Sequence, residues 1–147
     1  MRTISVNVPH GSMKKRCESR EKIELLRMRA DLLEGTNRVL MTMYLENGNT
    51  FRQMAKLMGV SESTVERQIY KLTKRLIEGE YITCVRNQHM FSKAEMAIAK
   101  DYFLNDLSMR NIARKRWLSF YTIHRIITKI ESILRQIEEG EKRRRTT

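Results

Sequence analysis

Apolar residues recur every three or four positions along most of the chain, which is the period of an α-helix with one buried face. The clearest stripe lies in residues 62–78, where Ser61 is a typical N-cap and Gly79 a typical stop signal. Glycine, serine and asparagine residues separate it from neighbouring stripes. The pattern predicts helices over about residues 14–33, 37–46, 51–58, 62–78, 93–105, 109–116 and 120–139.

Residues 80–92 interrupt the helical pattern. Tyr81 to Val85 are strand-prone and Asn87-Gln88 is typical of a turn, so this segment is predicted as a small hairpin or an extended linker. The two ends of the chain carry no sustained stripe. We expect residues 1–13 to be a disordered or non-native N-terminus and residues 140–147 to be a disordered basic tail.

An internal repeat at an offset of 58 residues relates the two halves of the chain. Residues 36–78 and 94–136 align without a gap, and about two or three identities would arise by chance at ordinary composition. The identical pairs are Tyr44/Tyr102, Asn47/Asn105, Arg52/Arg110, Ala55/Ala113, Ser61/Ser119, Thr64/Thr122, Arg67/Arg125, Ile69/Ile127, Lys71/Lys129 and Leu76/Leu134. The sequence therefore predicts an all-α fold that uses one three-helix unit twice.

Each unit has the spacing of a helix-turn-helix: a small residue at the helix crossing, Ala55 or Ala113, followed by a turn, a capping serine and a β-branched core residue. The run FRQMAKLMGVSESTVERQIYKLTKRL in the first unit fits this spacing throughout. It resembles the helix-turn-helix of region four of bacterial sigma factors and of LuxR-type response regulators. The resemblance covers about residues 37–78 and implies major-groove DNA binding by the helix that begins at Glu62.

The predicted organisation is a lead-in helix followed by two tandem helix-turn-helix units. The lead-in helix covers residues 14–35, the first unit 36–79, the linker or hairpin 80–92, and the second unit with its long C-terminal helix 93–139.

In the first unit, the candidate DNA contacts lie on the outward side of the last two helices. Arg67 suits a bidentate contact with guanine, Ser63 is short enough to meet a base edge, and either glutamate could accept from cytosine. The remaining residues suit phosphates, and an ordinary solvated helix face is the alternative interpretation. The full set is Thr50, Arg52, Gln53, Ser61, Glu62, Ser63, Glu66, Arg67, Tyr70, Lys71 and Lys74.

The second unit departs from the first at its turn. Trp117 replaces Gly59, so we expect that this turn cannot adopt a left-handed conformation cheaply. Phe120 and Tyr121 are expected to bury against Trp117 as an aromatic cluster, the alternative being contact with thymine methyl groups. The corresponding candidate DNA contacts are Arg110, Ser119, Tyr121, His124, Arg125, Thr128 and Lys129, of which the histidine is as readily explained as a solvated side chain.

The chain has 147 residues, with 29 Lys and Arg against 17 Asp and Glu, which gives a net charge of +12. This charge predicts a polyanionic partner, either nucleic acid or an anionic membrane surface. The membrane is disfavoured because no segment reaches the length of a membrane span and residues 14–33 lack a strongly apolar aromatic face.

No enzyme chemistry emerges from the sequence, since it contains no paired carboxylates, Cys/His/Asp set or phosphate-cradling loop. Cys17 and Cys84 stand apart from each other and from the three histidines, so neither a metal nor a cofactor is expected. Reduced thiols in a cytoplasmic, nucleoid-associated protein fit this composition.

The leading interpretation is a sequence-specific DNA-binding transcriptional regulator that reads the major groove of double-stranded DNA with two recognition helices. One alternative is a sigma-factor-like adaptor for RNA polymerase, in which one unit binds DNA and the other protein; another is a nonspecific nucleoid or RNA-binding protein. Apolar residues at 123, 126, 130, 133 and 137 also have heptad spacing. They predict either a homodimer through residues 123–137 or a lead-in helix folded over this stripe.

Overall fold

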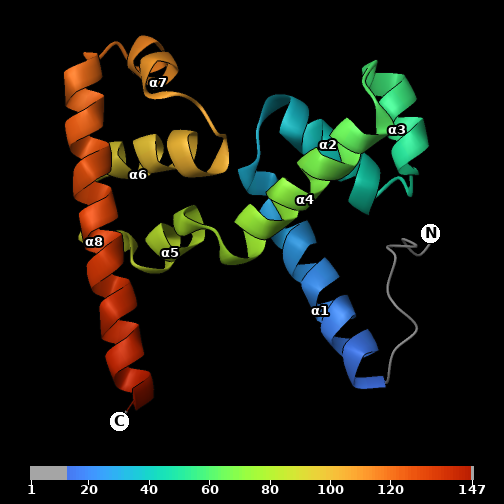
Figure 1. Ribbon diagram of the computed structural model, residues 1–147, viewed down its shortest axis with the longest axis horizontal. Helices are drawn as coiled ribbons and strands as arrows, with labels where there is room; N and C mark the ends of the chain where they lie inside the picture. Colours follow the sequence, from blue (N-terminus) through green and yellow to red (C-terminus); the bar gives the residue numbers. More distant parts are fainter. Residues whose placement is uncertain (1–12, 147) are drawn as a thin grey trace. The chain divides into compact units, whose positions relative to one another are not determined.

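The computed structural model describes residues 13–146, with side chains from Arg20 onward, and every regular element in that part of the chain is helical (Figure 1). The prediction of an all-α fold is confirmed. The chain divides into two compact units between Ile77 and Glu78, and each unit is described by itself. The segment expected to be a disordered or non-native N-terminus lies outside the described residues, apart from Met13.

Unit 1 begins with the lead-in helix and continues with the first three-helix segment. The stripe that the periodicity singled out, Val65, Ile69, Leu72 and Leu76, is buried along its whole length. Leucine and methionine side chains from the two preceding helices are buried as well, so the unit has a continuous apolar core. Its elements are α1 (Met13–Arg29), a 3₁₀ turn (Ala30–Leu32), α2 (Gly35–Leu45), α3 (Phe51–Met58) and α4 (Glu62–Glu78).

The lead-in helix is tied to the end of α4. Arg29 donates hydrogen bonds to the carbonyl oxygens of Leu76 and Ile77, at 2.6 and 3.1 Å. Carbonyl groups in the last turn of a helix lack partners within the helix, so the guanidinium satisfies groups that would otherwise need water. Leu26 and Leu33 are buried at the same end of the lead-in segment. The C-terminal part of α1 therefore belongs to the core of unit 1.

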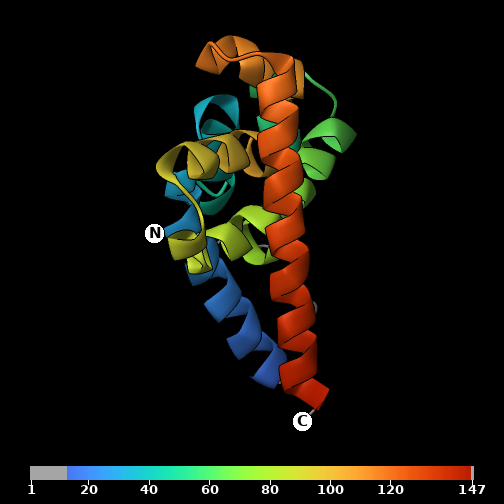
Figure 2. The ribbon, with the colours of Figure 1, turned by 90° about the vertical axis from the view of Figure 1, so that its left-hand side faces the viewer.

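Unit 2 packs three helices against one long helix, α8, which appears as a single straight rod in both ribbon views (Figures 1 and 2). Its central cluster consists of Ile98, Ile112, Ala113, Ile123 and Ile127. The elements are α5 (Glu80–Arg86), a 3₁₀ turn (Gln88–Met90), α6 (Lys93–Ala99) continued by a π-helical turn (Lys100–Leu104), α7 (Met109–Arg116) and α8 (Phe120–Thr146).

The prediction of a hairpin or extended linker in residues 80–92 is wrong, because α5 and a 3₁₀ turn occupy this segment. Tyr81, Ile82 and Cys84 are buried on one side of α5, which contacts α6 and α8. Strand propensity mainly reflects how well a side chain packs on a half-buried surface. Here the same side chains are buried just as well by a helix. The Asn87 side chain ends α5 by donating to the carbonyl oxygen of Thr83, at 2.9 Å.

The prediction of a disordered basic tail in residues 140–147 is also wrong as far as Thr146, because α8 continues to that residue. Lys142 lies 3.7 Å from Glu138, one helical turn earlier. Such pairs and the cations at the C-terminal end both favour a helix, even though no side chain described beyond Ile130 is buried.

Most of the heptad stripe in α8 is used inside unit 2. Ile123 and Ile130 are fully buried, and Ile126 packs against the central cluster. Of this stripe, Ile133 and Ile137 remain half-buried beyond the cluster. The homodimer through residues 123–137 stays a prediction, with less apolar surface available than the sequence pattern suggested.

The offset of 58 residues also relates the local geometry of the two units. Helices α3 and α7 begin and end at equivalent positions, and α4 and α8 begin at equivalent positions. The backbone N–H of Val60 donates to the Ala55 carbonyl at 3.1 Å, and Leu118 repeats this with Ala113 at 3.0 Å. Both alanines are buried. The repeat seen in the sequence is therefore a repeat of backbone hydrogen bonds as well as of residues.

Candidate nucleic-acid interface

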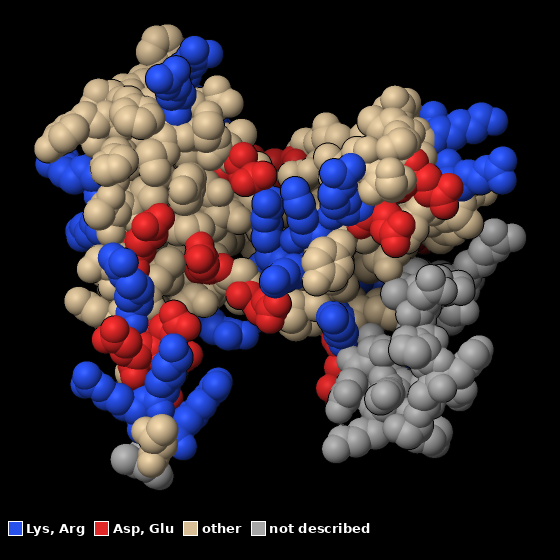
Figure 3. All heavy atoms as spheres, viewed as in Figure 1, with Lys and Arg blue, Asp and Glu red and all other residues tan. Residues whose placement is uncertain are grey.

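The exposed side of α4 carries the predicted contacts of unit 1. Arg67, Lys71 and Lys74 follow one another at helical spacing opposite the buried stripe, and all three are exposed. Figure 3 shows Lys and Arg side chains gathered in a row over α4. We call this surface the α4 face; its residues, all exposed, are Glu62, Ser63, Glu66, Arg67, Tyr70, Lys71 and Lys74.

Ser61 holds the beginning of the α4 face in place. Its Oγ accepts a hydrogen bond from the backbone N–H of Thr64 at 3.2 Å and lies 2.7 Å from the Thr64 hydroxyl. It also lies 3.2 Å from the hydroxyl of Ser63. This arrangement makes Ser61 an N-cap rather than a free reader of bases, and it orients the next serine at the start of the helix.

The start of α3 is organised by a capping box. Thr50 accepts a hydrogen bond from the Gln53 backbone N–H at 3.1 Å, and the Gln53 side chain accepts one from the Thr50 backbone N–H at 2.9 Å. The carbonyl side of the Gln53 amide is thereby occupied, which leaves its NH₂ group to donate. Arg52, between these two residues, is exposed beside the positive end of the helix dipole.

The turn of unit 2 adopts the left-handed conformation that the sequence predicted to be costly, but it lacks the predicted aromatic cluster. Trp117 has φ 57° and ψ 37°, close to the φ 70° and ψ 29° of Gly59. The aromatic cluster does not form, because Trp117 is 94% exposed and Tyr121 is 74% exposed. A residue with a Cβ in this conformation carries a strain of about 1–2 kcal/mol, which the packing of α7 and α8 on either side of the turn imposes.

The start of α8 repeats the cap of α4. Ser119 accepts a hydrogen bond from the Thr122 backbone N–H at 3.1 Å and lies 2.8 Å from the Thr122 hydroxyl. The Phe120 ring stacks on His124, with ring centroids 6.3 Å apart. His124, Arg125 and the remaining candidate residues of α7 and α8, namely Arg110, Thr128 and Lys129, are exposed.

Lys129 is held by a partner inside unit 2. Its Nζ lies 2.8 Å from Oε2 of Glu95, and Oε1 of Glu95 accepts a hydrogen bond from the Ser92 backbone N–H, also at 2.8 Å. The hydrogen bond from Lys129, and then that from Ser92, holds the pKa of Glu95 below its ordinary value. Lys129 thus links α8 to the capped start of α6.

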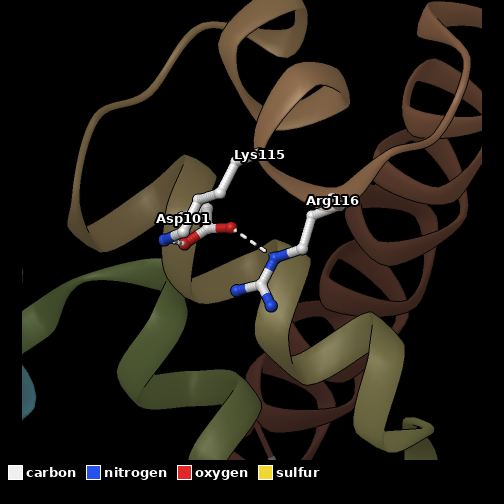
Figure 4. A network of polar contacts seen from close by, with 3 residues as sticks. All are labelled: Asp101, Lys115 and Arg116. Carbon is white, nitrogen blue, oxygen red and sulfur yellow. Dashed lines mark hydrogen bonds and ion pairs between the residues drawn. The ribbon is translucent and has the colours of Figure 1, made fainter.

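Asp101, which the sequence pattern did not single out, is a buried carboxylate between two cations (Figure 4). Its two oxygens lie 2.8 Å from Lys115 Nζ and 2.9 Å from Arg116 Nε. In the repeat, Asp101 is equivalent to Met43 of unit 1. An acidic residue at a position that is apolar in the other unit, in a unit that also contains the basic run Arg114 to Arg116, was the sequence signal that could have identified it. These contacts hold the C-terminal end of α7 against the π-helical turn, directly before Trp117.

The remaining polar features of unit 2 lie away from these surfaces. A hollow between α5 and α8 is lined largely by glutamates, and burial together with the charges of Glu131 and Glu138 raises the pKa of Glu80. Burial raises the pKa of the Cys84 thiol to about 11, so it is protonated at neutral pH. Among the described residues, no group of His, Cys, Asp and Glu side chains is arranged to hold a metal ion.

Comparison of the chain with protein-family models, with curated proteins and with solved structures finds no match. No helix within residues 13–146 has both the length and the apolar character needed to cross a bilayer. The function of the chain is therefore inferred from the surfaces described above.

Proposed function

We propose that the protein binds double-stranded DNA sequence-specifically through a helix-turn-helix in unit 1 and regulates transcription. The observation that carries this proposal is the α4 face: Arg67, Lys71 and Lys74 project from a helix that begins immediately after a rigid, capped turn. A helix with an exposed side lined by cations can lie in a major groove, whose width admits an α-helix. The net charge of +12 supplies the nonspecific attraction to phosphates.

The residues of the α4 face have separate roles in this proposal. Arg67, in the second turn of the helix, donates to the O6 and N7 atoms of a guanine. Ser63, nearer the start, meets a base edge, while Lys71 and Lys74 lie farther along and neutralise phosphates. The exposed Arg52 and the N-terminus of α3 bind a phosphate on the flanking strand, which fixes the register of α4 in the groove.

Selection of bound duplexes from a random DNA pool tests the proposal, because it reports specificity and site length together. The full chain should enrich one motif. Replacing Arg67 with alanine should weaken binding to that motif by about 1–3 kcal/mol and relax the preference at one base position.

Arg86→Ala provides the matched control, since it removes the same charge from an exposed position on α5. It should reduce affinity slightly and equally for all sequences. A pool that yields no enriched motif, or an R67A protein that keeps the full preference of the unchanged chain, would contradict the proposed function.

A further inference from the structure

We propose that the turn of unit 2 is a base-stacking site, in which Trp117, assisted by Tyr121, stacks on unpaired bases of a DNA strand. This inference rests on the proposal that the protein acts at DNA, and it gives unit 2 a different ligand from unit 1. Three observations on unit 2 carry it: the state of the indole, the way its turn is held, and the charge around it.

The indole is exposed at a cost in backbone strain. Trp117 is 94% exposed and sits at φ 57°, where an L-residue other than glycine is strained. Gly59 forms the equivalent turn of unit 1 without a side chain, so the fold does not need the indole. An exposed aromatic group that contributes little packing and adds strain is explained by a ligand better than by stability.

The turn that carries the indole is fixed on both sides. Before it, Asp101 holds Lys115 and Arg116 at 2.8 and 2.9 Å. After it, the Ser119 cap starts α8, and the Leu118 backbone N–H bonds to the Ala113 carbonyl at 3.0 Å. A backbone held in this way needs no rearrangement when the indole binds, so only the rotamers of the Trp117 side chain are restricted on stacking.

The charge around the indole selects a nucleic acid over an apolar protein partner. The chain between Asp106 and Glu131 contains six Lys and Arg residues and no Asp or Glu. Three of these cations pair with Asp101 or Glu95, and the other three, Arg110, Arg114 and Arg125, are exposed. Trp117 lines a hollow together with Ala113, Arg114 and Leu118, so one of the exposed arginines shares this surface with the indole. Aromatic side chains set among cations are the usual means of binding single strands, because bases stack on the rings while cations meet phosphates.

Unpaired bases are the ligand because only they present an open face to the indole. In an intact duplex each base is stacked on its neighbours, so an exposed ring meets bases only where the strands are separated or kinked. Tyr121, four residues after Trp117 in the first turn of α8, is 74% exposed and offers a second ring for a neighbouring base.

The chain contains one tryptophan, so its fluorescence reports directly on the proposed site. We would titrate the full chain with an oligothymidylate of about 12 nucleotides, a length within the range of single-strand sites. The comparison ligands are an abasic strand of equal length and charge and a duplex that carries the motif selected for unit 1. We expect strong quenching with the oligothymidylate and little with the abasic strand.

Trp117→Gly is the decisive variant, because glycine suits the left-handed turn and the protein should remain folded, as circular dichroism would verify. Its affinity for the oligothymidylate, measured by anisotropy of a labelled strand, should fall roughly 5- to 150-fold. Trp117→Phe should retain part of the affinity. Leu57→Ala, which trims an exposed apolar side chain of unit 1, should leave it unchanged.

Equal quenching by the abasic strand, or unchanged oligothymidylate binding by the folded W117G protein, would overturn the base-stacking proposal. If the surface around Trp117 instead binds an apolar protein, W117G should likewise leave oligothymidylate binding unchanged. If duplex selection still enriches a motif, the proposed function survives alone; if stacking is found but no motif is enriched, only the sequence-specific function fails.

Discussion

Gly59 and Trp117 share one left-handed backbone conformation, although glycine has no side chain and tryptophan has the largest. A Cβ added at Gly59 would meet no atom within 4 Å, so its substitution changes the backbone energy without a steric clash. Trp117 is almost wholly exposed and contributes little packing. The two positions therefore isolate the cost of a left-handed residue in a fold that repeats the same turn.

We expect Trp117→Gly to raise the free energy of unfolding by about 1 kcal/mol and Gly59→Ala to lower it by about the same amount. Chemical denaturation of both variants measures these changes. A loss of stability in W117G would show that the indole packs in solution, and it would contradict the strain on which the base-stacking proposal depends.

At the scale of elements, side chains of α8 shift the pKa values of one glutamate in α6 and one in α5 in opposite directions. Lys129 of α8 stabilises the Glu95 carboxylate of α6 at 2.8 Å, and the pKa of that carboxyl is lowered. Partial desolvation of Glu80, an exposed residue of α5, and repulsion from Glu131 and Glu138 of α8 instead raise the pKa of that carboxyl. Deprotonation of these two glutamates therefore has opposite effects on the stability of unit 2.

Glu95→Gln should lower the melting temperature at pH 7, and Glu80→Gln should raise it. Because folding lowers the pKa of Glu95, its carboxylate stabilises the folded state at pH values above the ordinary pKa of 4.5. This contribution is lost as the pH falls through the pKa of the folded state. The raised pKa of Glu80 destabilises the fold at neutral pH, and the penalty disappears below the same ordinary value.

Thermal melts of both variants and the unchanged protein between about pH 3 and 7 test the opposite signs and their convergence in acid. Two shifts in the same direction at pH 7 would contradict the charge arrangement around α8.

Periodicity predicted the elements where the buried side chains have helical spacing and recognisable caps. The bounds of α3, α4 and α7 follow directly from Thr50, Ser61 and the repeat. Residues 80–92 were missed because β-branched and aromatic residues can be buried equally well by a helix, and only the packing of α5 against α6 and α8 decides.

The candidate site was predictable in its positions but less so in its contacts. The exposed residues of α4 follow from helical spacing, since the buried stripe fixes the opposite side. The partners of Lys115, Arg116 and Lys129 could not be read from local spacing, because Asp101 and Glu95 lie far from them in sequence. The exposure of Trp117 likewise could not be predicted, because it depends on a left-handed turn that is unfavourable for tryptophan.

At the scale of the whole molecule, part of the positive charge is concentrated at the C-terminal end of α8. The last helix ends in the basic run Lys142 to Arg145, whose side chains are exposed on a helical frame. No side chain described beyond Ile130 is buried, so the run supports α8 through surface pairs such as Lys142–Glu138 and not through the apolar core. It is therefore suited to adding electrostatic affinity for a polyanion without disturbing that core.

Replacing Lys142 to Arg145 with glutamine should weaken DNA binding without changing the selected motif. The slope of log affinity against log salt should become shallower by about 0.9 for each phosphate that the run no longer neutralises. Titrations with duplex DNA at several salt concentrations give this slope, and a changed motif or an unchanged slope would be inconsistent with the role assigned to the run.

The agreement of helix bounds, caps and turn hydrogen bonds at a single offset makes each unit an internal reference for the other. Gly59 and Trp117 stand at equivalent positions and share one backbone conformation. Exchanging these two residues between the units would therefore measure, within one molecule, what a side chain adds to a turn of fixed geometry.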